Sequence, residues 1–359
     1  MANPPPPRHR RDFEIAVICA LQLEADAVEA LFDKFYDRHV YGKARGDTNS
    51  YTMGMIDRHN VVLAYMPDIG KGSAASVAAS FRYSFEGIKL GLVVGVCGGV
   101  PNGTDEEKEI LLGDVIISTG LVEYNFGRQF PDKFIRKDTL ESNLGRPNAE
   151  IRSFLARIKG RTGRMHLKNN TFTSLEALYQ IPGFERAQYP GVDEDKLFKP
   201  TYRHRHQNLP SCITCTKCEN KGDKVCIAAL NMSCLELKCD EGKLVPRDRL
   251  IRAKESIVAQ HPCIHFGKIA SGDTVMKSGE DRDEIATKEK VIAFEMEGAG
   301  VWDNFPCVVI KGVCDYADSH KNKKWQGYAA ATAAACMKAI LREWICTGKP
   351  WESEIPPGE

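Results

Sequence analysis

The feature that most constrains the fold is a set of short, almost wholly apolar segments that recur along the chain. The clearest are residues 14–19 (EIAVIC), 90–97 (LGLVVGVC) and 307–313 (CVVIKGV). Runs of this kind, rich in Val and Ile and without alternation, are typical of strands covered on both faces of a sheet. Helical patterns separate them, and strands that alternate with helices predict an α/β fold.

The remaining elements follow from the same patterns. Further strands are expected at 51–56 and 61–66, which form a hairpin turning at 57–60, and at 114–121, 264–270 and 292–296. Helices are expected at 149–158, 281–288, 298–304 and 328–344. We therefore predict one domain over residues 13–347, preceded by a disordered, proline-rich leader (1–12) and followed by a polar tail (348–359). Residues 151–257 read as an insertion that decorates one edge of this domain.

Composition excludes several classes of protein. Of the 359 residues, 43% are hydrophobic and 27% are charged, and the net charge of +1 gives no reason to expect a nucleic-acid or membrane partner. No apolar run approaches the roughly 20 residues that span a bilayer. The N-terminal segment lacks the apolar core of a secretory signal, and several of the 13 cysteines lie in apolar strands. These features predict a cytoplasmic protein with reduced thiols.

Two acidic residues lie at predicted strand ends. Glu24 follows the first strand, and Asp315 ends the strand at 307–313. Open α/β sheets bind ligands beyond the carboxyl ends of their strands, so both acids are candidates for a site. Each also has a structural alternative: Glu24 as an acid in a first helical turn, and Asp315 as the residue that begins an Asx turn. Asp318 suits the role of turn or cap better than Asp315.

A third candidate is the run Glu295-Met296-Glu297, which lies between a predicted strand and a helix. The two-residue period of a strand directs both glutamates to the same side. A carboxylate placed there can accept hydrogen bonds from two neighbouring hydroxyls of a sugar, while the methionine packs on the sugar ring. The structural alternative is a first-turn acid with a core methionine.

The order of these segments along the chain resembles the nucleoside phosphorylase and nucleosidase superfamily. The segments are ICALQLE (18–24), GVCGGV (95–100), SGDT (271–274), EMEG (295–298) and CDYAD (314–318), and residues 114–127 match as well. Methylthioadenosine/S-adenosylhomocysteine nucleosidases are especially similar, as is a fungal branch found alone or at the N-terminus of NLR-like receptors. The resemblance covers residues 13–344 outside the insertion. It implies a three-layer α/β/α sandwich with a central mixed sheet, and a homo-oligomer.

The resemblance also implies an enzyme that hydrolyses the bond between a purine and its ribose. Asp315 then donates a proton to purine N7, and Glu24 is the base that activates water. Glu297 matches the residue that holds the ribose hydroxyls. The other positions assigned to the substrate are Gly98, Val275, Met276, Glu295 and Met296. An aromatic residue is usual where Val275 stands, so Phe126 or Tyr124 is a candidate to stack on the base instead.

Alternatives to a hydrolase remain open. Phosphorylases of this superfamily bind phosphate through an Arg and a Ser, and Val93 and Val96 stand at those positions. A phosphate dianion without such partners is poorly stabilised, which favours hydrolysis over phosphorolysis. A domain that senses or assembles without catalysis is a third hypothesis. It predicts the loss of Glu24, Glu297 or Asp315, yet all three are present.

Basic residues suggest which chemical group the substrate carries at its 5′ position. Lys71 and Arg128 are the principal candidates, and Lys133, Arg136 and Lys137 follow closely. Cations there suit a phosphate chain, although most charged runs are solvated surface. Relatives fused to immune receptors cleave adenine nucleotides, ATP included, so the resemblance favours an adenine nucleotide. Adenosine and methylthioadenosine or S-adenosylhomocysteine are the alternative substrates.

The insertion carries a second strong local pattern, six cysteines within residues 212–239. In a reducing compartment such a cluster suggests a structural zinc ion, which would brace a segment that lacks a core. We expect the ligands to be Cys212, Cys215, Cys218 and Cys226, with His204 and His206 as additional candidates. Disulfides or unliganded thiols remain alternatives. Catalysis as outlined above requires no cofactor.

Overall fold

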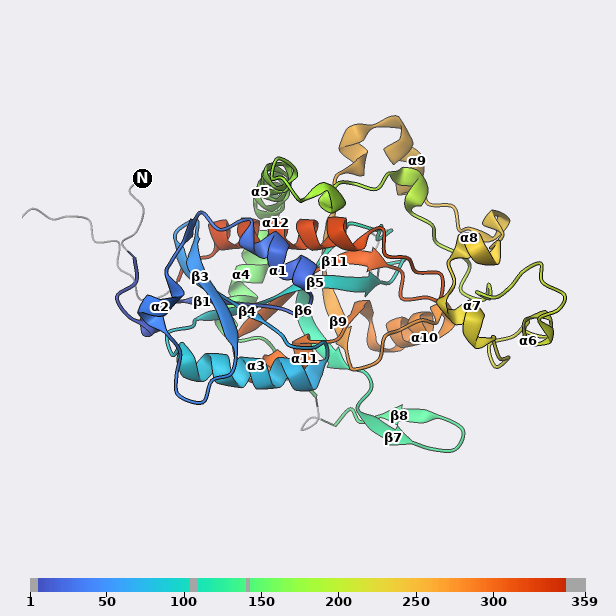
Figure 1. The fold of residues 1–359 in the computed structure, drawn as a ribbon, viewed down its shortest axis with the longest axis horizontal. Helices are drawn as coiled ribbons and strands as arrows, with labels where there is room; N and C mark the ends of the chain where they lie inside the picture. Colours follow the sequence, from blue (N-terminus) through green and yellow to red (C-terminus); the bar gives the residue numbers. More distant parts are fainter. Residues whose placement is uncertain (1–5, 104–108, 140–142, 347–359) are drawn as a thin grey trace, which may run out of the picture.

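A nine-stranded mixed sheet forms the centre of the computed structural model, which describes residues 6–103, 109–139 and 143–346 (Figure 1). The strand order is β10-β9-β6-β11-β5-β1-β4-β3-β2. The strands are β1 (Ile15–Cys19), β2 (Lys34–Phe35), β3 (Ser50–Ile56), β4 (His59–Tyr65), β5 (Leu90–Gly99), β6 (Val115–Glu123), β9 (Ile264–Ser271), β10 (Val291–Glu295) and β11 (Cys307–Asp315).

Strand β5 is the strand on which the site depends. It runs parallel to β1 on one side and to β11 on the other, and its last residues, Gly98 and Gly99, pair antiparallel with β10. Because β10 also pairs with β9, the strands β5, β11, β6, β9 and β10 close on themselves. The end of β10 runs antiparallel to β5. The residues that follow β10 therefore lie beside β5, near the carboxyl ends of β1 and β11.

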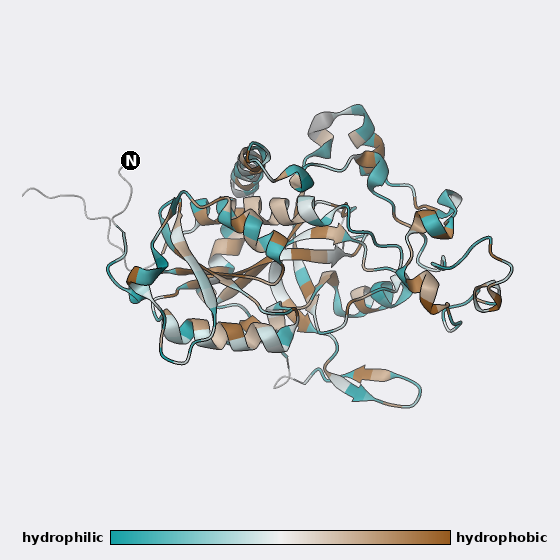
Figure 2. Cartoon of the chain, in the orientation of Figure 1, coloured by the Kyte–Doolittle hydropathy of each residue, from teal (hydrophilic) through white to brown (hydrophobic). Residues whose placement is uncertain are grey.

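Helices cover both faces of the sheet (Figure 1). On one face α12 (Gln326–Glu343) packs on α1 (Gln22–Glu29), on α5 (Arg161–Tyr179) and on the strands β5 and β11. On the other face α3 (Lys71–Ser84) packs on α11 (Gly298–Trp302). Two more helices, α4 (Ala149–Lys159) and α10 (Gly279–Glu289), and a short α2 (Arg38–Tyr41) complete the body. Figure 2 shows hydrophobic residues concentrated in the sheet and on the inner helix faces. The predicted three-layer mixed α/β fold is confirmed.

The strands and helices predicted from periodicity are all present, with shifted ends. The β3–β4 turn is tighter than expected, since only Asp57 and Arg58 lie between the strands, with Asp57 in the left-handed region at a φ of 55°. Residues 8–12, predicted as part of a disordered leader, form a turn in which Asp12 Oδ2 accepts hydrogen bonds from the backbone amides of Arg8 and His9. The predicted tail at 348–359 lies outside the described residues.

The predicted insertion divides into two parts. Helices α4 and α5 bury Ile158, Leu167 and Leu175 in the main core, so they belong to the α/β body. The 19-residue helix α5 escaped prediction because its apolar residues are sparse among Lys, Arg, Asn and Thr. The later part, with α6 (Ile213–Thr216), α7 (Ile227–Asn231), α8 (Cys234–Leu237) and α9 (Asp248–Glu255), stands apart at the right of Figure 1. We call residues 202–243 the cysteine lobe.

A second projection is the hairpin of β7 (Gly127–Gln129) and β8 (Phe134–Arg136). It leaves the body below the cysteine lobe (Figure 1). Among the described residues, no helix combines the length and the apolar character needed to cross a membrane.

Close packing of β11 on α12 gives a first prediction. A Cβ atom added to Gly312 would lie 1.9 Å from the carbonyl oxygen of Ala329. We expect Gly312→Ala to lower the free energy of unfolding by about 1–3 kcal/mol or more, because backbone atoms must move apart. Gly120→Ala in β6 is the matched control, since its nearest neighbour is the Lys268 Cγ at 3.9 Å. Urea denaturation measures both, and equal stability of the two variants would contradict the described packing.

Candidate active site

Glu24 lies at the start of α1, where the chain turns from β1 over the edge of the sheet. Its carboxylate accepts three backbone hydrogen bonds, from Ala20 at 3.0 Å, Leu21 at 2.9 Å and Val96 at 2.7 Å. The side chain is almost fully buried. Burial raises the pKa of Glu24, the positive charge of Lys311 opposes that rise, and the negative charge of Glu297 adds to it. The residue thus has a fixed orientation and a raised proton affinity.

The absence of a side chain at Gly95 makes room for this carboxylate. A Cβ atom there would lie 2.2 Å from Glu24 Oε1. Lys311 of β11 pairs in register with Gly95, so the lysine and the glutamate meet over the same point of β5. Lys311 is the residue that sequence reasoning missed, because a single lysine in an apolar strand carries no motif of its own.

Lys311 is buried and connects the acids of two elements. Its Nζ lies 2.8 Å from Glu297 Oε2 and 3.8 Å from Glu295 Oε2. Burial opposes a charged lysine, but the carboxylates of Glu297, Glu24 and Glu295 together raise its pKa well above the usual range. Lys311 therefore stays protonated and pairs with Glu295 and Glu297, while Glu24 acts on it through its charge.

Glu295 and Glu297 have different partners. Glu295 accepts hydrogen bonds from the backbone amides of Glu297 and Gly298, which start α11, and burial raises its pKa. Its role in the structure is thus to hold the turn. Glu297 contacts Lys311, and Met296 between them is half-buried. Both glutamates contact Lys311, but Glu297 already has helical backbone angles at the start of α11, so the two-residue period of a strand does not by itself account for it.

Asp315 ends β11 opposite Gly98. Its Oδ1 accepts a hydrogen bond from the Ala317 amide at 2.8 Å, and its Oδ2 lies 3.4 Å from Lys321 Nζ. A Cβ atom on Gly98 would lie 2.9 Å from Asp315 Oδ1, so this glycine makes room for the aspartate as Gly95 does for Glu24. Asp318 Oδ1 accepts from the His320 amide, which confirms the turn role expected for it.

Apolar residues flank Asp315 on the side expected for a purine. A cluster of Tyr124, Phe294, Val100 and Ala317 is buried there, and Met276 packs against it. Tyr124 is held by a hydrogen bond to the Thr274 carbonyl and by an edge-on contact with Phe294. Val275 and Phe126 are exposed, by 46% and 44%. The structure thus brings Met276 and Tyr124 to this cluster, while Val275 and Phe126 face outward.

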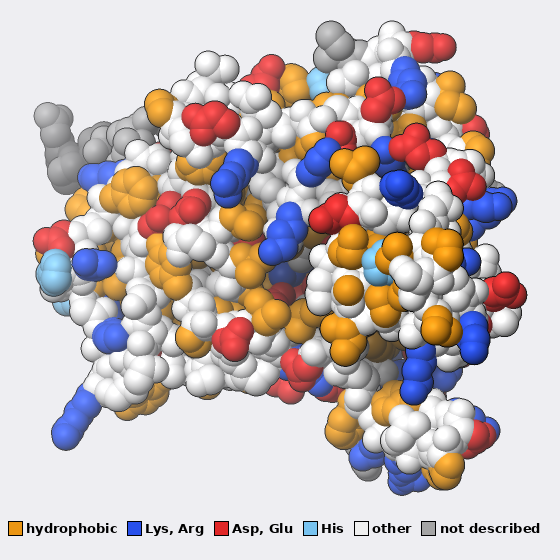
Figure 3. Space-filling model, turned by 45° about the vertical axis from the view of Figure 1, so that its right-hand side comes forward, with side chains coloured by type: hydrophobic (Ala, Val, Ile, Leu, Met, Phe, Trp, Pro, Cys, Tyr) orange, Lys and Arg blue, Asp and Glu red, His pale blue; other side chains and the backbone are white. Residues whose placement is uncertain are grey.

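The predicted cations lie in two environments. Lys71, at the start of α3, contacts the acids Glu123 and Asp273 and the Asn125 side chain. Arg128 is exposed on the β7–β8 hairpin, where Lys137 lies over the Phe126 ring at 5.6 Å. Basic side chains gather on this hairpin, at the lower edge of Figure 3. Lys71 therefore has two carboxylate partners, whereas the hairpin is predominantly basic.

A hollow separates the α/β body from the cysteine lobe in the same view.

The cysteines of the lobe form two groups, and the predicted ligand set changes in one respect. Cys212, Cys215 and Cys226 come together with His206. Cys218 lies outside that group, and its sulfur accepts a hydrogen bond from Arg203 Nε at 3.5 Å. His206 was among the additional candidates, whereas Cys218, which the spacing included, does not join the group.

Comparison with known proteins agrees with this fold. A family model described as the phosphorylase superfamily matches residues 14–168. A nucleotide-binding leucine-rich repeat (NLR)-like protein of Hyaloscypha variabilis is 29% identical over 337 residues, which are 92% of this chain and 29% of the relative. An aminodeoxyfutalosine nucleosidase of Helicobacter pylori is 34% identical over 99 residues, 25% of this chain and 43% of the relative.

Solved structures share the fold at low identity. Futalosine hydrolase of H. pylori aligns with a TM-score of 0.54 and 16% identity over 93% of this chain and 99% of its own. The 5′-methylthioadenosine/S-adenosylhomocysteine nucleosidase of H. pylori aligns with a TM-score of 0.51 and 18% identity, over 93% and 99% of the two chains.

The family model over residues 14–168 and these relatives make the chain similar to proteins of the phosphorylase superfamily. The chain resembles the NLR-like protein over nearly all of its own length. It spans less than a third of that relative and less than half of the aminodeoxyfutalosine nucleosidase.

The buried lysine gives a second prediction. Lys311→Met leaves Glu24, Glu295 and Glu297 without their cation, and we expect a loss of about 3–5 kcal/mol of stability at pH 7. Without the opposing charge of Lys311, the pKa values of Glu24 and Glu295, already raised by burial, rise further above those of the unfolded chain. The variant's deficit should therefore shrink as the pH falls toward 5 and these groups take up protons.

Lys338→Met is the matched control, because Lys338 is also buried but pairs with a single, 40% exposed acid, Asp33. Chemical denaturation at the two pH values measures the effect. A Lys311→Met deficit no larger than that of Lys338→Met, or one independent of pH, would contradict the described charge cluster.

Proposed function

We propose that this protein hydrolyses the N-glycosidic bond of a purine nucleoside or nucleotide and releases the free base. One observation carries the proposal: Glu24 and Asp315 face β5 at two glycines, Gly95 and Gly98, with the Glu297–Lys311 pair beside the first. A pair of carboxyl groups can divide the acid and base tasks at one glycosidic bond, by the logic of glycoside hydrolysis.

Each residue has a chemical task in this proposal. Asp315 protonates N7 of the purine while the C1′–N9 bond breaks, and Lys321 stabilises the carboxylate left behind. The sugar becomes an oxocarbenium-like cation. Glu24 takes a proton from water, whose oxygen bonds to C1′. Glu297, fixed by Lys311, accepts hydrogen bonds from the ribose hydroxyls.

The surroundings of Glu24 support water rather than phosphate as the nucleophile. Val93 is buried and apolar, and the Val96 amide already donates to Glu24 Oε1. Neither residue offers a cationic side chain to a phosphate dianion, and the Glu24 carboxylate would repel one. The similar proteins named as nucleosidases or hydrolases support the same reaction class.

For the substrate we propose an adenine nucleotide such as ATP. The basic β7–β8 hairpin beside Tyr124 and Phe126, and the similarity to an NLR-like protein, support it. The second candidate is a nucleoside with an uncharged 5′ group, such as adenosine or methylthioadenosine. The acidic partners of Lys71, Glu123 and Asp273, favour that alternative because they neutralise a cation that was predicted to bind the phosphate chain.

A substrate panel tests the reaction and the acid. We expect adenine to be released without phosphate from at least one of ATP, AMP, adenosine and methylthioadenosine, fastest from the nucleotides. Asp315→Asn should lower that rate by about 10²–10⁴-fold, the usual contribution of a general acid, with an unchanged thermal unfolding curve. Chromatography measures adenine. Release only with phosphate present would favour a phosphorylase, and a near-normal Asp315→Asn rate would remove Asp315 from the mechanism.

The pH dependence tests Glu24 as the base. Glu24 must be ionised, so kcat/KM should be full above its pKa and fall as the pH drops through it. Burial raises this pKa, so kcat/KM should begin to fall at a higher pH than it would with an ordinary glutamate as the base. Lys311→Met removes the opposing positive charge, so we expect its acid limb at still higher pH. An unchanged limb in Lys311→Met would show that another group titrates.

A further inference from the structure

Two groups of cysteine and histidine side chains lie outside the candidate active site. One is His206, Cys212, Cys215 and Cys226, and the other is His204, Cys234, Cys239 and His320. In each group of the described structure, one nitrogen or sulfur atom from every residue lies within 4.8 Å of all the others. The second group is the more informative, because His320 comes from outside the lobe, only five positions after Asp315.

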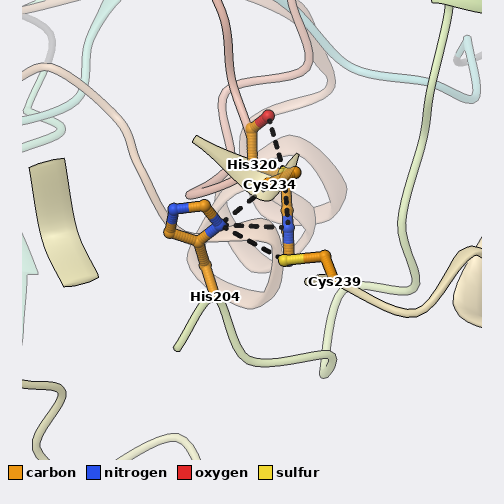
Figure 4. A group of neighbouring side chains, drawn as sticks. All are labelled: His204, Cys234, Cys239 and His320. Atoms are coloured by element: carbon orange, nitrogen blue, oxygen red, sulfur yellow. Dashed lines mark hydrogen bonds between the residues drawn. The ribbon is translucent and has the colours of Figure 1, made fainter. Parts of the chain in front are cut away.

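The distances in the second group match a tetrahedral ion site (Figure 4). The Nδ1 atoms of His204 and His320 are 3.3 Å apart, and Cys234 Sγ lies 3.7 Å and 3.5 Å from them. Cys239 Sγ is 3.8 Å from His204 Nδ1. Around tetrahedral zinc, with Zn–S about 2.3 Å and Zn–N about 2.0–2.1 Å, two nitrogens lie roughly 3.3 Å apart and nitrogen and sulfur roughly 3.6 Å apart.

The outer hydrogen bonds of the two histidines fix which nitrogen faces the centre. His204 Nε2 lies 2.9 Å from the Met232 carbonyl, and His320 Nε2 lies 3.1 Å from the Tyr202 carbonyl. A carbonyl oxygen only accepts, so each Nε2 carries the proton and each neutral ring directs a bare Nδ1 lone pair inward. Two such lone pairs facing each other at 3.3 Å call for a cation between them, and a backbone carbonyl is a common second partner of metal-bound histidine.

We propose that His204, Cys234, Cys239 and His320 bind a zinc ion that fastens the cysteine lobe to the loop carrying Asp315. Two thiolates and two imidazoles in tetrahedral arrangement are a typical zinc ligand set. The group of His206, Cys212, Cys215 and Cys226 binds a second zinc ion within the lobe, where the distances from His206 Nδ1 to Cys215 Sγ and Cys226 Sγ are both 3.5 Å.

The loop between β11 and α12 has further partners from the inserted segment. Phe198 and Tyr202 stack on the His320 ring, with centroids 4.2 Å and 5.3 Å away. Asp195 accepts a hydrogen bond from the Tyr316 hydroxyl. Lys321, the next residue after His320, contacts Asp315. The ion therefore holds the loop that follows Asp315 and carries Lys321, whichever reaction is catalysed.

Metal analysis of the purified full chain tests the proposal. We expect two zinc ions per chain, one for each group, and one ion after Cys234→Ser or Cys212→Ser. Cys218→Ser is the matched control, a cysteine of the same lobe outside both groups, and should retain two ions. Wild-type protein without zinc, or loss of an ion in Cys218→Ser but not in Cys234→Ser, would overturn the assignment.

X-ray absorption at the zinc edge keeps the test valid if a variant fails to fold. The wild-type spectrum should report five sulfur and three nitrogen ligands shared by two ions. One ion bound by four sulfurs would contradict it and favour a site of cysteines alone.

Trypsin tests the link to the loop, because Lys323 and Lys324 are exposed. Cys234→Ser should speed cleavage there at least several-fold, while Cys212→Ser should not. Equal cleavage in both variants would refute the fastening role.

Discussion

The attraction between buried Lys311 and the carboxylates of Glu24, Glu295 and Glu297 is the interaction on which the site depends. Its ammonium group pairs with both acids at the end of β10, and the charge of Glu24 at the start of α1 also acts on it. Burial makes each of these charges unfavourable on its own, so the carboxylates need the lysine and the lysine needs the carboxylates. The glycines at positions 95 and 98 let the acids approach the sheet more closely than any side chain would permit.

The sequence predicted much of this and missed specific parts. Apolar periodicity located the strands, and the order of Glu24, Glu297 and Asp315 suggested a single site. Lys311 could not be predicted, because its role comes from register: it stands opposite Gly95, under Glu24. His206 could be named as a candidate, but the exclusion of Cys218 and the inclusion of His320 have the same origin. Pairings set by tertiary contact leave no spacing in the sequence.

The lobe and the α/β body are stabilised in different ways. The body buries a large apolar core, whereas the lobe's own buried cluster is only Cys215, Ala229 and Leu237. A lobe with so little apolar surface needs cross-links, and two metal groups would supply them. Because one of them includes His320, the lobe would also set the position of the Asp315 loop. Such a connection makes an insertion part of the catalytic architecture rather than a decoration.

In the proposed reaction Glu24, oriented by the backbone amides of Ala20, Leu21 and Val96, directs water to the sugar. The most direct test is to react the preferred adenine substrate in ¹⁸O-labelled water containing inorganic phosphate. The account predicts one ¹⁸O atom at C1 of the ribosyl product and free adenine, as mass spectrometry would detect. A ribosyl phosphate without label, or no adenine from any substrate tested, would contradict it.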